Sequence, residues 1–399
     1  MSGALMGRLF DVLRNPYDKE RNPSGIINLG SAENFKIDPH HCGYGEGATG
    51  SHRLRTAMAR HLNCYFKPVD PVQADDISFA AGVTAINEMF GYSLADEGDG
   101  VLLNKPIYGA FENDLTTKAR LKTVYVTLDG ADPFNADVVE KYEEALNEAE
   151  RHGTKTRVLL LSNPHNPLGQ CYPPETLKAL LQFCQKHQLH LVSDEVYALS
   201  VFDSGRPNAL PFSSVLSIDL AGLIDTHLVH VLYGLSKDFA AGGLRLGCLV
   251  TRNMEMRQAM RAISMFHWPS SLSDLVAARI LEDEAFVTKY IRLSRDRLAN
   301  SYHLATGMLE EAKIAYHQGG NAGFFLWIDL SPYLPPTPDT TDSLEGERLL
   351  TKRIMDAGVY LATGEEFHSE HAGWYRIIFA QERDKLVEGL ERIISIAKN

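Results

Sequence analysis

The sequence lacks the cysteine spacing that a disulfide framework or a zinc site requires. Its five cysteines, at positions 42, 64, 171, 184 and 248, are odd in number, scattered along the chain and never arranged as Cys-x-x-Cys. Disulfide scaffolds and structural zinc sites use paired or regularly spaced cysteines. We therefore expect no metal site, and we expect a reducing compartment with the cytoplasm as the default location.

Long apolar runs and basic charge are scarce as well. No run reaches the length of a transmembrane helix, and residues 1–20 mix charged with apolar residues, unlike a secretory signal. The chain has 39 Lys and Arg against 51 Asp and Glu, a formal net charge of −12 at pH 7, and no basic run. We therefore expect neither a nucleic-acid partner nor a membrane partner, whereas a cationic substrate would be tolerated.

The chain does contain a regular alternation of apolar runs and helical patterns. At 399 residues with 44% hydrophobic content, it can bury a large core and exceeds the size of most single domains. Apolar runs typical of buried strands occur at 77–79, 101–104, 123–128, 157–162, 189–193, 227–232 and 247–251. Because helical patterns such as 85–94, 137–151 and 174–187 separate most of them, the sequence predicts an α/β fold with a seven-stranded, mostly parallel sheet covered on both faces.

A second, smaller domain is predicted after this alternation. Following a long helical pattern at 285–313, the remainder reads as α+β. The predicted elements are strands at 323–329 and 375–380 and helices at 344–357 and 383–396. We divide the chain into an N-terminal arm (1–45), a large ligand-binding domain (46–290) and a small C-terminal α+β domain (291–399).

A lysine follows one of the predicted strands. Lys237 comes after the run at 227–232, and Arg245 lies eight positions further on. Ligands of parallel α/β sheets bind beyond the carboxyl ends of the strands. A lysine held there suits pyridoxal 5'-phosphate (PLP), because its amine can condense with the cofactor aldehyde and the guanidinium can bind the phosphate. A Ser-Lys pair alone is more often part of a surface loop, so this hypothesis depends on the other strand ends.

Other strand ends carry side chains that match such a site. Asp194 ends a buried run, where an aspartate can keep a pyridine nitrogen protonated, although it could also cap a helix. Asn166 lies in the double Asn-Pro motif at 162–169, whose prolines force an extended backbone and can fix an amide beside the ring oxygen. Val83 and Thr84 open a helix after a strand, a position that favours phosphate, although such helix starts are commonly without a ligand.

Two further residues extend the predicted site. Tyr108 follows the strand at 101–104 and could lay its ring on the cofactor, although such a tyrosine is more often a packing residue. Arg376 lies within an otherwise apolar strand, and a cation there requires an anion. The natural anion is a substrate carboxylate held by the bidentate guanidinium, and an internal salt bridge is the alternative.

Together these motifs resemble the fold-type I PLP enzymes of the aminotransferase class I/II family. Within this family the chain is most similar to 1-aminocyclopropane-1-carboxylate (ACC) synthases and ACC synthase-like proteins, from about residue 25 to the C-terminus. The resemblance is carried by Asn-Leu-Gly-Ser-Ala-Glu-Asn at 28–34, the double Asn-Pro motif, Ser-Asp-Glu-Val-Tyr at 193–197, Leu-Ser-Lys-Asp at 235–238 and Gly-Trp-Tyr-Arg at 373–376. It implies a PLP-dependent homodimer whose active site borrows residues from the neighbouring subunit.

The resemblance also implies a role for each matching residue. Lys237 would bind the cofactor covalently, Asp194 would face the pyridine nitrogen, and Arg376 would bind the α-carboxylate of an amino acid. The remaining implied contacts are Tyr108 for stacking, Asn166 and Tyr197 for the ring hydroxyl, Val83, Thr84 and Arg245 for the phosphate, Ser236 as a further cofactor contact, and Glu33 and again Asn166 beside the substrate.

Two positions affect how the phosphate would be bound. Many relatives place a phosphate-binding hydroxyl three residues before the lysine, where this chain has Gly234, so that contact is missing or supplied elsewhere. The family also sends a tyrosine across the dimer to the phosphate. It should lie in the glycine-rich loop at 44–50, and we assign it to Tyr44.

The motifs leave the reaction open. In the reading that the resemblance favours, Lys237 removes the α-proton of S-adenosylmethionine, and the carbanion expels methylthioadenosine and closes a cyclopropane, an α,γ-elimination. Glu33 would attract the sulfonium, although it could instead tether the arm through a salt bridge. The alternatives are an aminotransferase between an L-amino acid and a 2-oxo acid, a β/γ C–S lyase of specialised metabolism, and a catalytically silent dimer. The three enzymes need the same contacts to the cofactor, so the pocket around the substrate side chain decides the product.

Overall fold

A seven-stranded sheet forms the centre of the computed structural model, which describes residues 15, 17–27, 43–336 and 344–398. The strand order is β1-β7-β6-β5-β4-β2-β3. The strands are β1 (Ile77–Ala80), β2 (Gly100–Asn104), β3 (Lys122–Val126), β4 (Thr156–Ser162), β5 (His190–Asp194), β6 (Val229–Gly234) and β7 (Gly247–Thr251). Neighbouring strands are parallel except for β7, which runs antiparallel to both β1 and β6. The predicted α/β fold with a mostly parallel sheet is confirmed.

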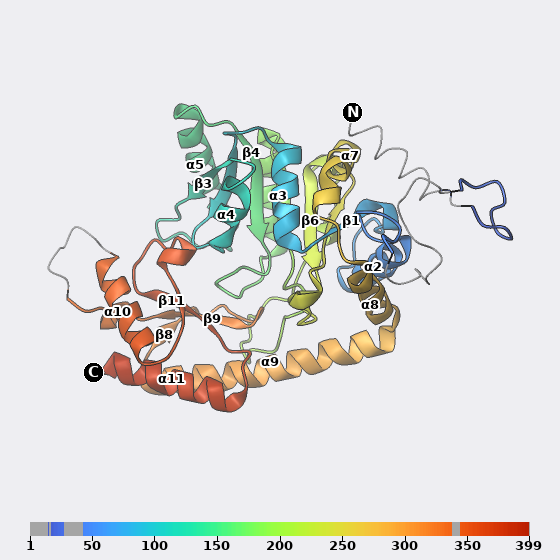
Figure 1. Ribbon diagram of the computed structural model, residues 1–399. Coiled ribbons are helices and arrows are strands. Elements are labelled where there is room, and N and C mark those ends of the chain that lie inside the picture. Colours follow the sequence, from blue (N-terminus) through green and yellow to red (C-terminus); the bar gives the residue numbers. More distant parts are fainter. Residues whose placement is uncertain (1–14, 16, 28–42, 337–343, 399) are drawn as a thin grey trace.

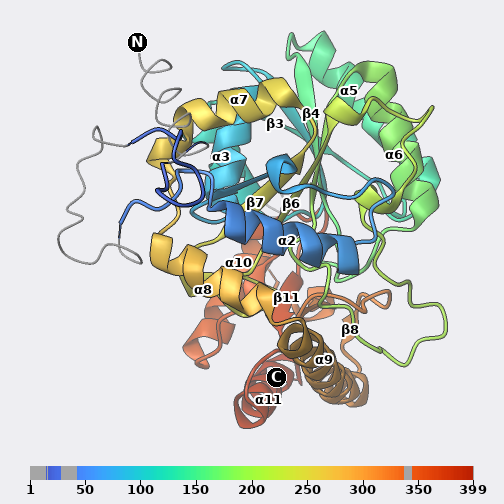
Figure 2. The same ribbon diagram turned by 90° about the vertical axis from the view of Figure 1, so that its right-hand side faces the viewer.

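Helices cover both faces of this sheet (Figures 1 and 2). One face packs against α2 (His52–Tyr65), α5 (Val139–Arg151), α6 (Pro174–His187) and α8 (Ser271–Glu282). The other face packs against α3 (Val83–Leu94), α4 (Ala110–Thr116) and α7 (Met254–Ile263). Along β2, Leu102 belongs to the first core, whereas Val101 and Leu103 belong to the second. Because both faces are buried, successive positions of the strand are apolar, which is why the sequence shows the strands as continuous apolar runs.

A second sheet forms the core of the small domain. Its four antiparallel strands lie in the order β10 (Ala362–Thr363), β11 (Trp374–Ile378), β9 (Phe325–Asp329) and β8 (Ala315–Tyr316). They pack against α9 (Glu284–Ala312), α10 (Glu345–Asp356) and α11 (Arg383–Lys398) through apolar side chains. The 29-residue helix α9 reaches from the side of α8 to the small domain, so it joins the two cores (Figure 1).

The predicted elements occur with shifts of a few residues at their ends. The helix predicted at 174–187 has these bounds in the structure, and α4, α7 and α8 are additions to the predicted pattern. Short 3₁₀ helices lie at Ala74–Asp76, Ala136–Val138, Val215–Ser217, Thr226–Leu228, Gly242–Leu244, Ser264–Phe266, Ser331–Tyr333 and Glu365–Phe367. The predicted domain boundary at 290–291 falls inside the continuous helix α9, and the division into three parts stays a prediction. In the described part of the chain, no helix combines the length and the apolar character needed to cross a lipid bilayer.

Candidate active site

Several strand ends of the large sheet open into one cavity of about 210 Å³. The parallel strands β4, β5 and β6 lie side by side, with Ser162 paired to Asp194 and Asp194 paired to Leu232. Their carboxyl ends therefore lie at the same edge of the sheet, next to the start of α3. The cavity contains both the Lys237 amine and the Asp194 carboxylate, on which the PLP hypothesis depends. The predicted site residues that line it are Val83, Thr84, Tyr108, Asn166, Asp194, Tyr197, Ser236, Lys237 and Arg245.

Asp194 is the last residue of β5 and is only 6% exposed. Its Oδ1 accepts a hydrogen bond of 3.2 Å from the Val196 backbone N–H. Burial raises the pKa of Asp194 to about 7, and this N–H and the cationic Lys237 only partly oppose the rise. An ionised carboxylate at this position therefore needs a cation close to it.

Lys237 follows β6 after a short turn and is partly buried. Its Nζ lies 5.8 Å from the centroid of the Tyr197 ring. Burial lowers the pKa of Lys237, Asp194 opposes this shift, and the cations Arg376 and Arg245 add to it. Within the described residues, no hydrogen bond or ion pair of the Nζ is observed, so the amine is available to react.

The start of α3 lies beside the Arg245 guanidinium. Gly82 caps this helix with φ +94°, and the backbone N–H groups of Val83 and Thr84 have no acceptor in the described part of the chain. A Cβ on Gly82 would lie 2.5 Å from the Arg245 Nη2, and a Cβ on Gly247 would lie 2.5 Å from the Val83 nitrogen. The two glycines thus let β7 and the guanidinium approach the helix start, which creates a site for an anion.

Gly234 lies at the end of β6, where it pairs with Gly247 of β7. A Cβ at Gly234 would lie 2.7 Å from the Leu246 carbonyl oxygen and 3.0 Å from the Cα of Gly247. This close strand contact leaves no room for a side chain at position 234.

Arg376 projects from β11 of the small domain toward the large domain. One of its terminal nitrogens, Nη1, donates a hydrogen bond of 2.9 Å to Asn166 Oδ1, and the guanidinium lies 4.6 Å from the centroid of the Phe367 ring. Burial lowers the pKa of Arg376. Its buried Nε has no hydrogen-bond partner, and among the described residues no carboxylate forms an ion pair with it. The internal salt bridge considered as an alternative is therefore not found in the described structure, and the guanidinium can bind a carboxylate.

Two tyrosines border the cavity. Tyr197 is 4% exposed, and its ring makes edge contacts with Phe324 and Phe325 at centroid distances of 5.2 Å. Tyr108 lies between β2 and α4, where its ring makes an edge contact with Phe111 at 5.3 Å. Burial raises the pKa of both phenols, so both stay protonated and can donate hydrogen bonds at neutral pH.

The cavity has further lining residues to which the sequence alone assigns no role: Asn87, Phe111, Asp114, Ser162 and Val196. The Nδ2 of Asn87 donates a hydrogen bond of 2.8 Å to Asp114 Oδ2. Burial raises the pKa of Asp114. Helical spacing could have indicated Asn87, which lies four residues after Val83 and therefore on the same face of α3. Strand ends could have indicated Ser162 and Val196, which end β4 and follow β5.

One predicted residue, Tyr44, does not line this cavity, and another, Glu33, cannot be placed. Tyr44 is 61% exposed, and its ring lies 5.8 Å from that of Trp268 in a separate hollow. The contact of Tyr44 with the phosphate of a neighbouring subunit therefore stays a prediction. Glu33 lies outside the described residues, as does most of the arm.

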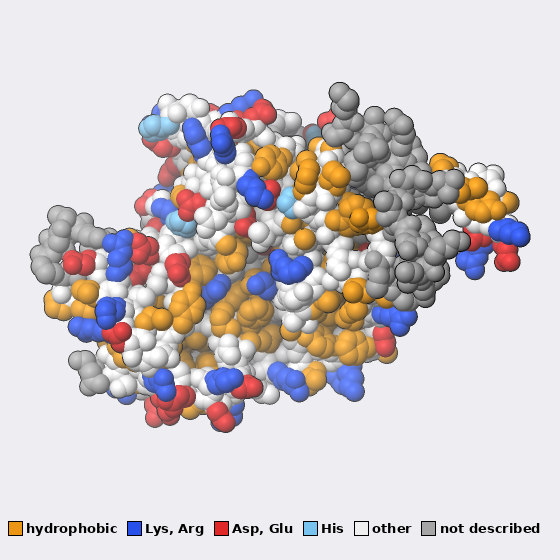
Figure 3. Space-filling model, in the orientation of Figure 1, with side chains coloured by type: hydrophobic (Ala, Val, Ile, Leu, Met, Phe, Trp, Pro, Cys, Tyr) orange, Lys and Arg blue, Asp and Glu red, His pale blue; other side chains and the backbone are white. Residues whose placement is uncertain are grey.

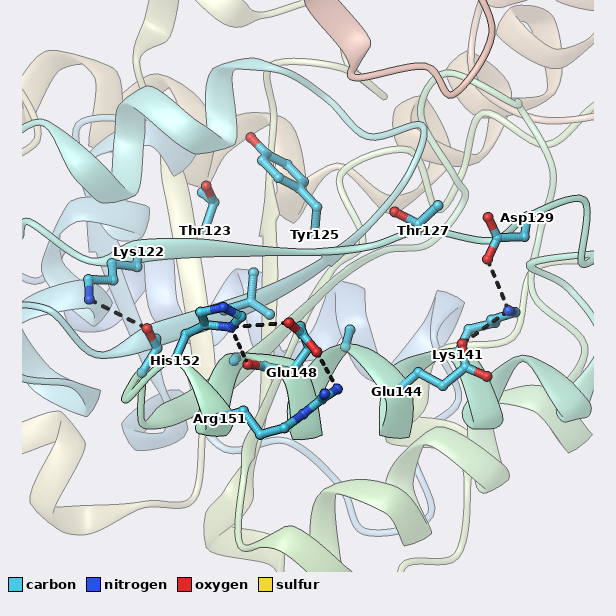
Figure 4. A pocket seen from close by; sticks show the side chains of 14 residues that line it. Lys122, Thr123, Tyr125, Thr127, Asp129, Lys141, Glu144, Glu148, Arg151 and His152 are labelled. Atoms are coloured by element: carbon cyan, nitrogen blue, oxygen red, sulfur yellow. Dashed lines mark hydrogen bonds and ion pairs between the residues drawn. The ribbon is translucent and has the colours of Figure 1, made fainter.

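A larger hollow of about 580 Å³ lies on the surface between β3 and α5 (Figure 4). Most of its charged side chains are paired with one another, and the Lys122 amine donates a hydrogen bond of 3.4 Å to the Thr154 hydroxyl. Lys141 contacts Asp129 at 3.1 Å and Glu144 at 3.0 Å, and Arg151 pairs with Glu148. Because these contacts engage its lysine and arginine side chains, we take the smaller cavity, rather than this hollow, as the candidate active site.

The residues of the smaller cavity fit PLP. A free amine suits the aldehyde, a buried carboxylate without a cation pair suits a protonated ring nitrogen, and the start of α3 with Arg245 suits the phosphate. Among the described residues, no group of His, Cys, Asp and Glu is arranged to hold a metal ion.

The chain is similar to known proteins in both sequence and structure. The 1-aminocyclopropane-1-carboxylate synthase-like protein 1 of Homo sapiens is 33% identical over 400 residues, which cover 94% of this chain and 77% of that protein. The probable aminotransferase gliI of Aspergillus fumigatus is 33% identical over 391 residues, which cover 92% of this chain and 88% of that protein. A double mutant of Thermus thermophilus aspartate aminotransferase has the same fold, with a TM-score of 0.72 at 21% identity over 88% of this chain and 83% of that chain. The model of the family described as aminotransferase class I and II matches residues 42–393, so the chain belongs to this family of PLP-dependent enzymes.

Proposed function

We propose that this enzyme binds PLP through Lys237 and holds the α-carboxylate of an amino acid with Arg376. The observation that carries the proposal is the shared cavity of Lys237 and Asp194, which Asn166 links to Arg376. Burial lowers the pKa of Lys237, so its amine is neutral, and hence nucleophilic, at a lower pH than that of an exposed lysine.

The side chains have separate tasks in this proposal. When bound, PLP supplies a protonated pyridine ring that withdraws electrons from the α-carbon of the substrate. Asp194 keeps the ring nitrogen protonated, because its buried carboxylate requires a cation. Lys237 accepts the α-proton on Nζ as a general base, and Arg376 orients the α-carbon through two N–H groups. The other proposed contacts are Tyr108 on the ring face, Asn166 and Tyr197 at the ring oxygen, and Val83, Thr84, Ser236 and Arg245 around the phosphate.

We further propose that the reaction is ACC synthase-like, an α,γ-elimination on S-adenosylmethionine or a related sulfur-containing amino acid. Support comes from the motifs at 28–34 and 193–197 and from the human relative, which is named an ACC synthase-like protein. The net charge of −12 also favours a cationic substrate over an anionic one. Glu33 keeps its proposed role beside the sulfonium.

Transamination is the second candidate reaction. The Aspergillus relative is named a probable aminotransferase and is 33% identical to this chain, as the human relative is. In this alternative, Lys237 returns the proton to a carbon of the cofactor, and the substrate does not form a ring. Cleavage of a C–S bond at the β- or γ-carbon is the third, and it uses the same side chains.

One incubation series separates these reactions. The full chain is loaded with PLP and incubated with S-adenosylmethionine, and the products are read by mass spectrometry. Equal amounts of methylthioadenosine and ACC are expected. If neither forms while L-amino acids and 2-oxo acids exchange amino groups, the aminotransferase candidate replaces the lyase. If a thiol and a 2-oxo acid appear from a cysteine conjugate, C–S lyase activity replaces both.

We also propose that the chain forms a homodimer, located in the cytoplasm. Exposed apolar side chains gather on the face that carries α7, α8 and the start of α9 (Figure 3). They are Met254, Met265, Phe266, Leu272, Val276 and Phe286. A second copy covering this face would bury them and bring Tyr44 of one subunit toward the other. Sedimentation at micromolar concentration is expected to give a dimer, and Phe266→Glu is expected to weaken it.

A further inference from the structure

The carboxylate of Asp238 is next to Lys237 in the chain and is almost fully buried, with 4% of the residue exposed. Three donors reach its two oxygens. Oδ2 accepts from the Leu199 backbone N–H at 2.9 Å and from the Tyr233 hydroxyl at 3.1 Å, and Oδ1 accepts from the Ser200 hydroxyl at 2.5 Å. A buried carboxylate is stable only when donors satisfy it in this way, so Asp238 has a defined structural task.

The donors come from two segments that carry the proposed active-site residues. Tyr233 lies on β6, which leads to Lys237. β5 ends at Asp194, and the turn that follows it carries Tyr197, Leu199 and Ser200. Asp238 therefore links the segment that carries Lys237 to the segment that carries Asp194 and Tyr197. These hydrogen bonds connect residues 38 and 39 positions apart, so local structure alone does not hold them together.

The network reaches two long helices as well. His61 of α2 lies 3.3 Å from the Tyr233 hydroxyl through its Nε2, and the Nε of Arg295 on α9 donates a hydrogen bond of 2.8 Å to the Leu199 carbonyl. Asp238 thus lies where α2, β6, the turn after β5 and α9 meet. Such a junction restricts movement of the residue next to it along the chain.

Asp194, rather than Asp238, is the carboxylate whose charge raises the pKa of Lys237. The oxygens of Asp238 are occupied by donors of Leu199 and Ser200 on the turn after β5 and of Tyr233 on β6. Asp238 therefore acts on the lysine through the backbone and not through its charge.

We propose that Asp238 is a positioning residue that holds the Lys237 amine beside Tyr197 and Asp194 by fastening the turn after β5 to the segment after β6. The inference rests on the proposed function, because it takes Lys237 as the amine that binds PLP.

The test compares Asp238→Ala with Asp238→Asn in the full chain loaded with PLP. An asparagine can still accept from Leu199 and Tyr233 and can donate to the Ser200 hydroxyl, whereas an alanine removes every bond. Absorbance of the bound cofactor is titrated against pH without substrate. For Asp238→Ala we expect the midpoint to rise by roughly half a pH unit or more, because the Lys237 nitrogen, no longer held in place, moves away from its buried, cation-rich position. For Asp238→Asn we expect a midpoint close to that of the unchanged protein.

Turnover gives a second readout. In Asp238→Ala, kcat is expected to fall roughly 10- to 100-fold, as for a misplacement of about 1 Å, while KM changes little because Arg376 is untouched. Ser200→Ala and Tyr233→Phe each remove one donor and are expected to give smaller shifts in the same direction, and they test the inference if Asp238→Ala does not fold.

Glu347→Gln is the matched control. Glu347 is also a buried carboxylate that joins two loops, through the backbone N–H groups of Glu365 and Gly373, but it lies in the small domain. We expect it to lower the melting temperature without moving the absorbance midpoint. The inference would be overturned, and the proposed function left standing, if the unchanged protein, Asp238→Ala and both single-donor variants had the same midpoint. It would also be overturned if Asp238→Asn behaved like Asp238→Ala, since the charge of Asp238 would then matter. An unchanged protein that binds no PLP would overturn the proposed function and the inference together.

Discussion

The two hollows of the large domain differ in what they leave unpaired. The one between β3 and α5 holds about 580 Å³, and its Lys141 and Arg151 side chains contact carboxylates, while Lys122 donates to the Thr154 hydroxyl (Figure 4). The one at the strand ends holds about 210 Å³ and contains an amine and a carboxylate that are not ion-paired within the described residues. Exposed ion pairs contribute little free energy, whereas an unpaired buried charge is costly. Unpaired buried groups, rather than volume, therefore mark the site of chemistry.

The largest expected effect follows from removing the amine. Lys237→Ala should abolish the absorbance of covalently bound PLP and lower turnover by at least roughly four orders of magnitude, because no other group in the cavity can act as nucleophile and base. Borohydride reduction followed by peptide mapping should place the label on Lys237 in the unchanged protein. Lys141→Ala in the larger hollow is the control and should keep both the label and the activity. Label on another lysine would show that the cofactor is bound outside the cavity at the strand ends.

Replacing the buried carboxylate should have the next largest effect. Asp194→Asn keeps the shape of the side chain but cannot hold a proton on the ring nitrogen. We expect kcat to fall by roughly two to three orders of magnitude, the size of effect typical for a lost electrostatic contact in an active site. Glu148→Gln, which removes a paired surface carboxylate, should leave kcat unchanged. An Asp194→Asn variant with normal kcat would show that the cavity does not use this charge.

Removal of the guanidinium should act on substrate binding. For Arg376→Ala we expect KM for an amino acid to rise roughly 10- to 100-fold, because a hydrogen-bonded charge pair contributes about 1.5–3 kcal/mol. Arg376→Lys should recover only part of the loss, since an ammonium does not bind a carboxylate in a bidentate way. Steady-state kinetics measure both variants. An amine without a carboxylate group, used as substrate, should be insensitive to the change.

The pH dependence of stability should also differ between the cavity at the strand ends and the hollow between β3 and α5. Burial raises the pKa of Asp194 and of Asp238 to about 7 and that of Glu195 to about 8. The stability that such groups contribute is complete below the unfolded pKa near 4 and is lost as pH rises through 7 to 8. Buried histidines such as His61, whose pKa burial lowers to about 4, act in the opposite direction, but their contribution is complete above about pH 6.5.

We therefore expect the melting temperature of the cofactor-free chain to fall between pH 6.5 and pH 8. Asp194→Asn should reduce this fall, because an amide does not titrate, whereas Glu148→Gln should not change it. Calorimetry at the two pH values measures the difference. A melting temperature that rises over this interval would show that the buried carboxyls do not hold their protons.

The smallest effect is expected in the larger hollow. Lys141→Ala should change the free energy of unfolding by no more than about 0.5 kcal/mol, because both of its partner carboxylates, Asp129 and Glu144, are exposed to solvent. Urea unfolding measures this value. A loss of unfolding free energy above about 1.5 kcal/mol would mean that the ion pairs of this hollow contribute more than exposed pairs usually do.

Much of the site could be predicted because its residues occupy the ends of strands. Asp194 and Lys237 each follow a continuous apolar run, and parallel strands bring their carboxyl ends to one edge. The Asn87–Asp114 pair could not be predicted in the same way. Its members lie on different helices, 27 residues apart, and their contact depends on how α3 and α4 pack. Asp238 is another such case, because its adjacent position to Lys237 was visible while its burial was not.

The sequence by itself determined the order of strands and helices, the class of fold and the residues at the strand ends, because apolar periodicity and the glycine and proline positions act locally. Only the tertiary structure decided which of those residues meet. Arg376 lies in β11 of the small sheet and Asn166 lies in the turn after β4, 210 residues away, yet they share a hydrogen bond. The raised pKa of Asp194 and the lowered pKa of Lys237 were likewise decided by packing, since desolvation depends on the segments that surround a group and not on its neighbours along the chain.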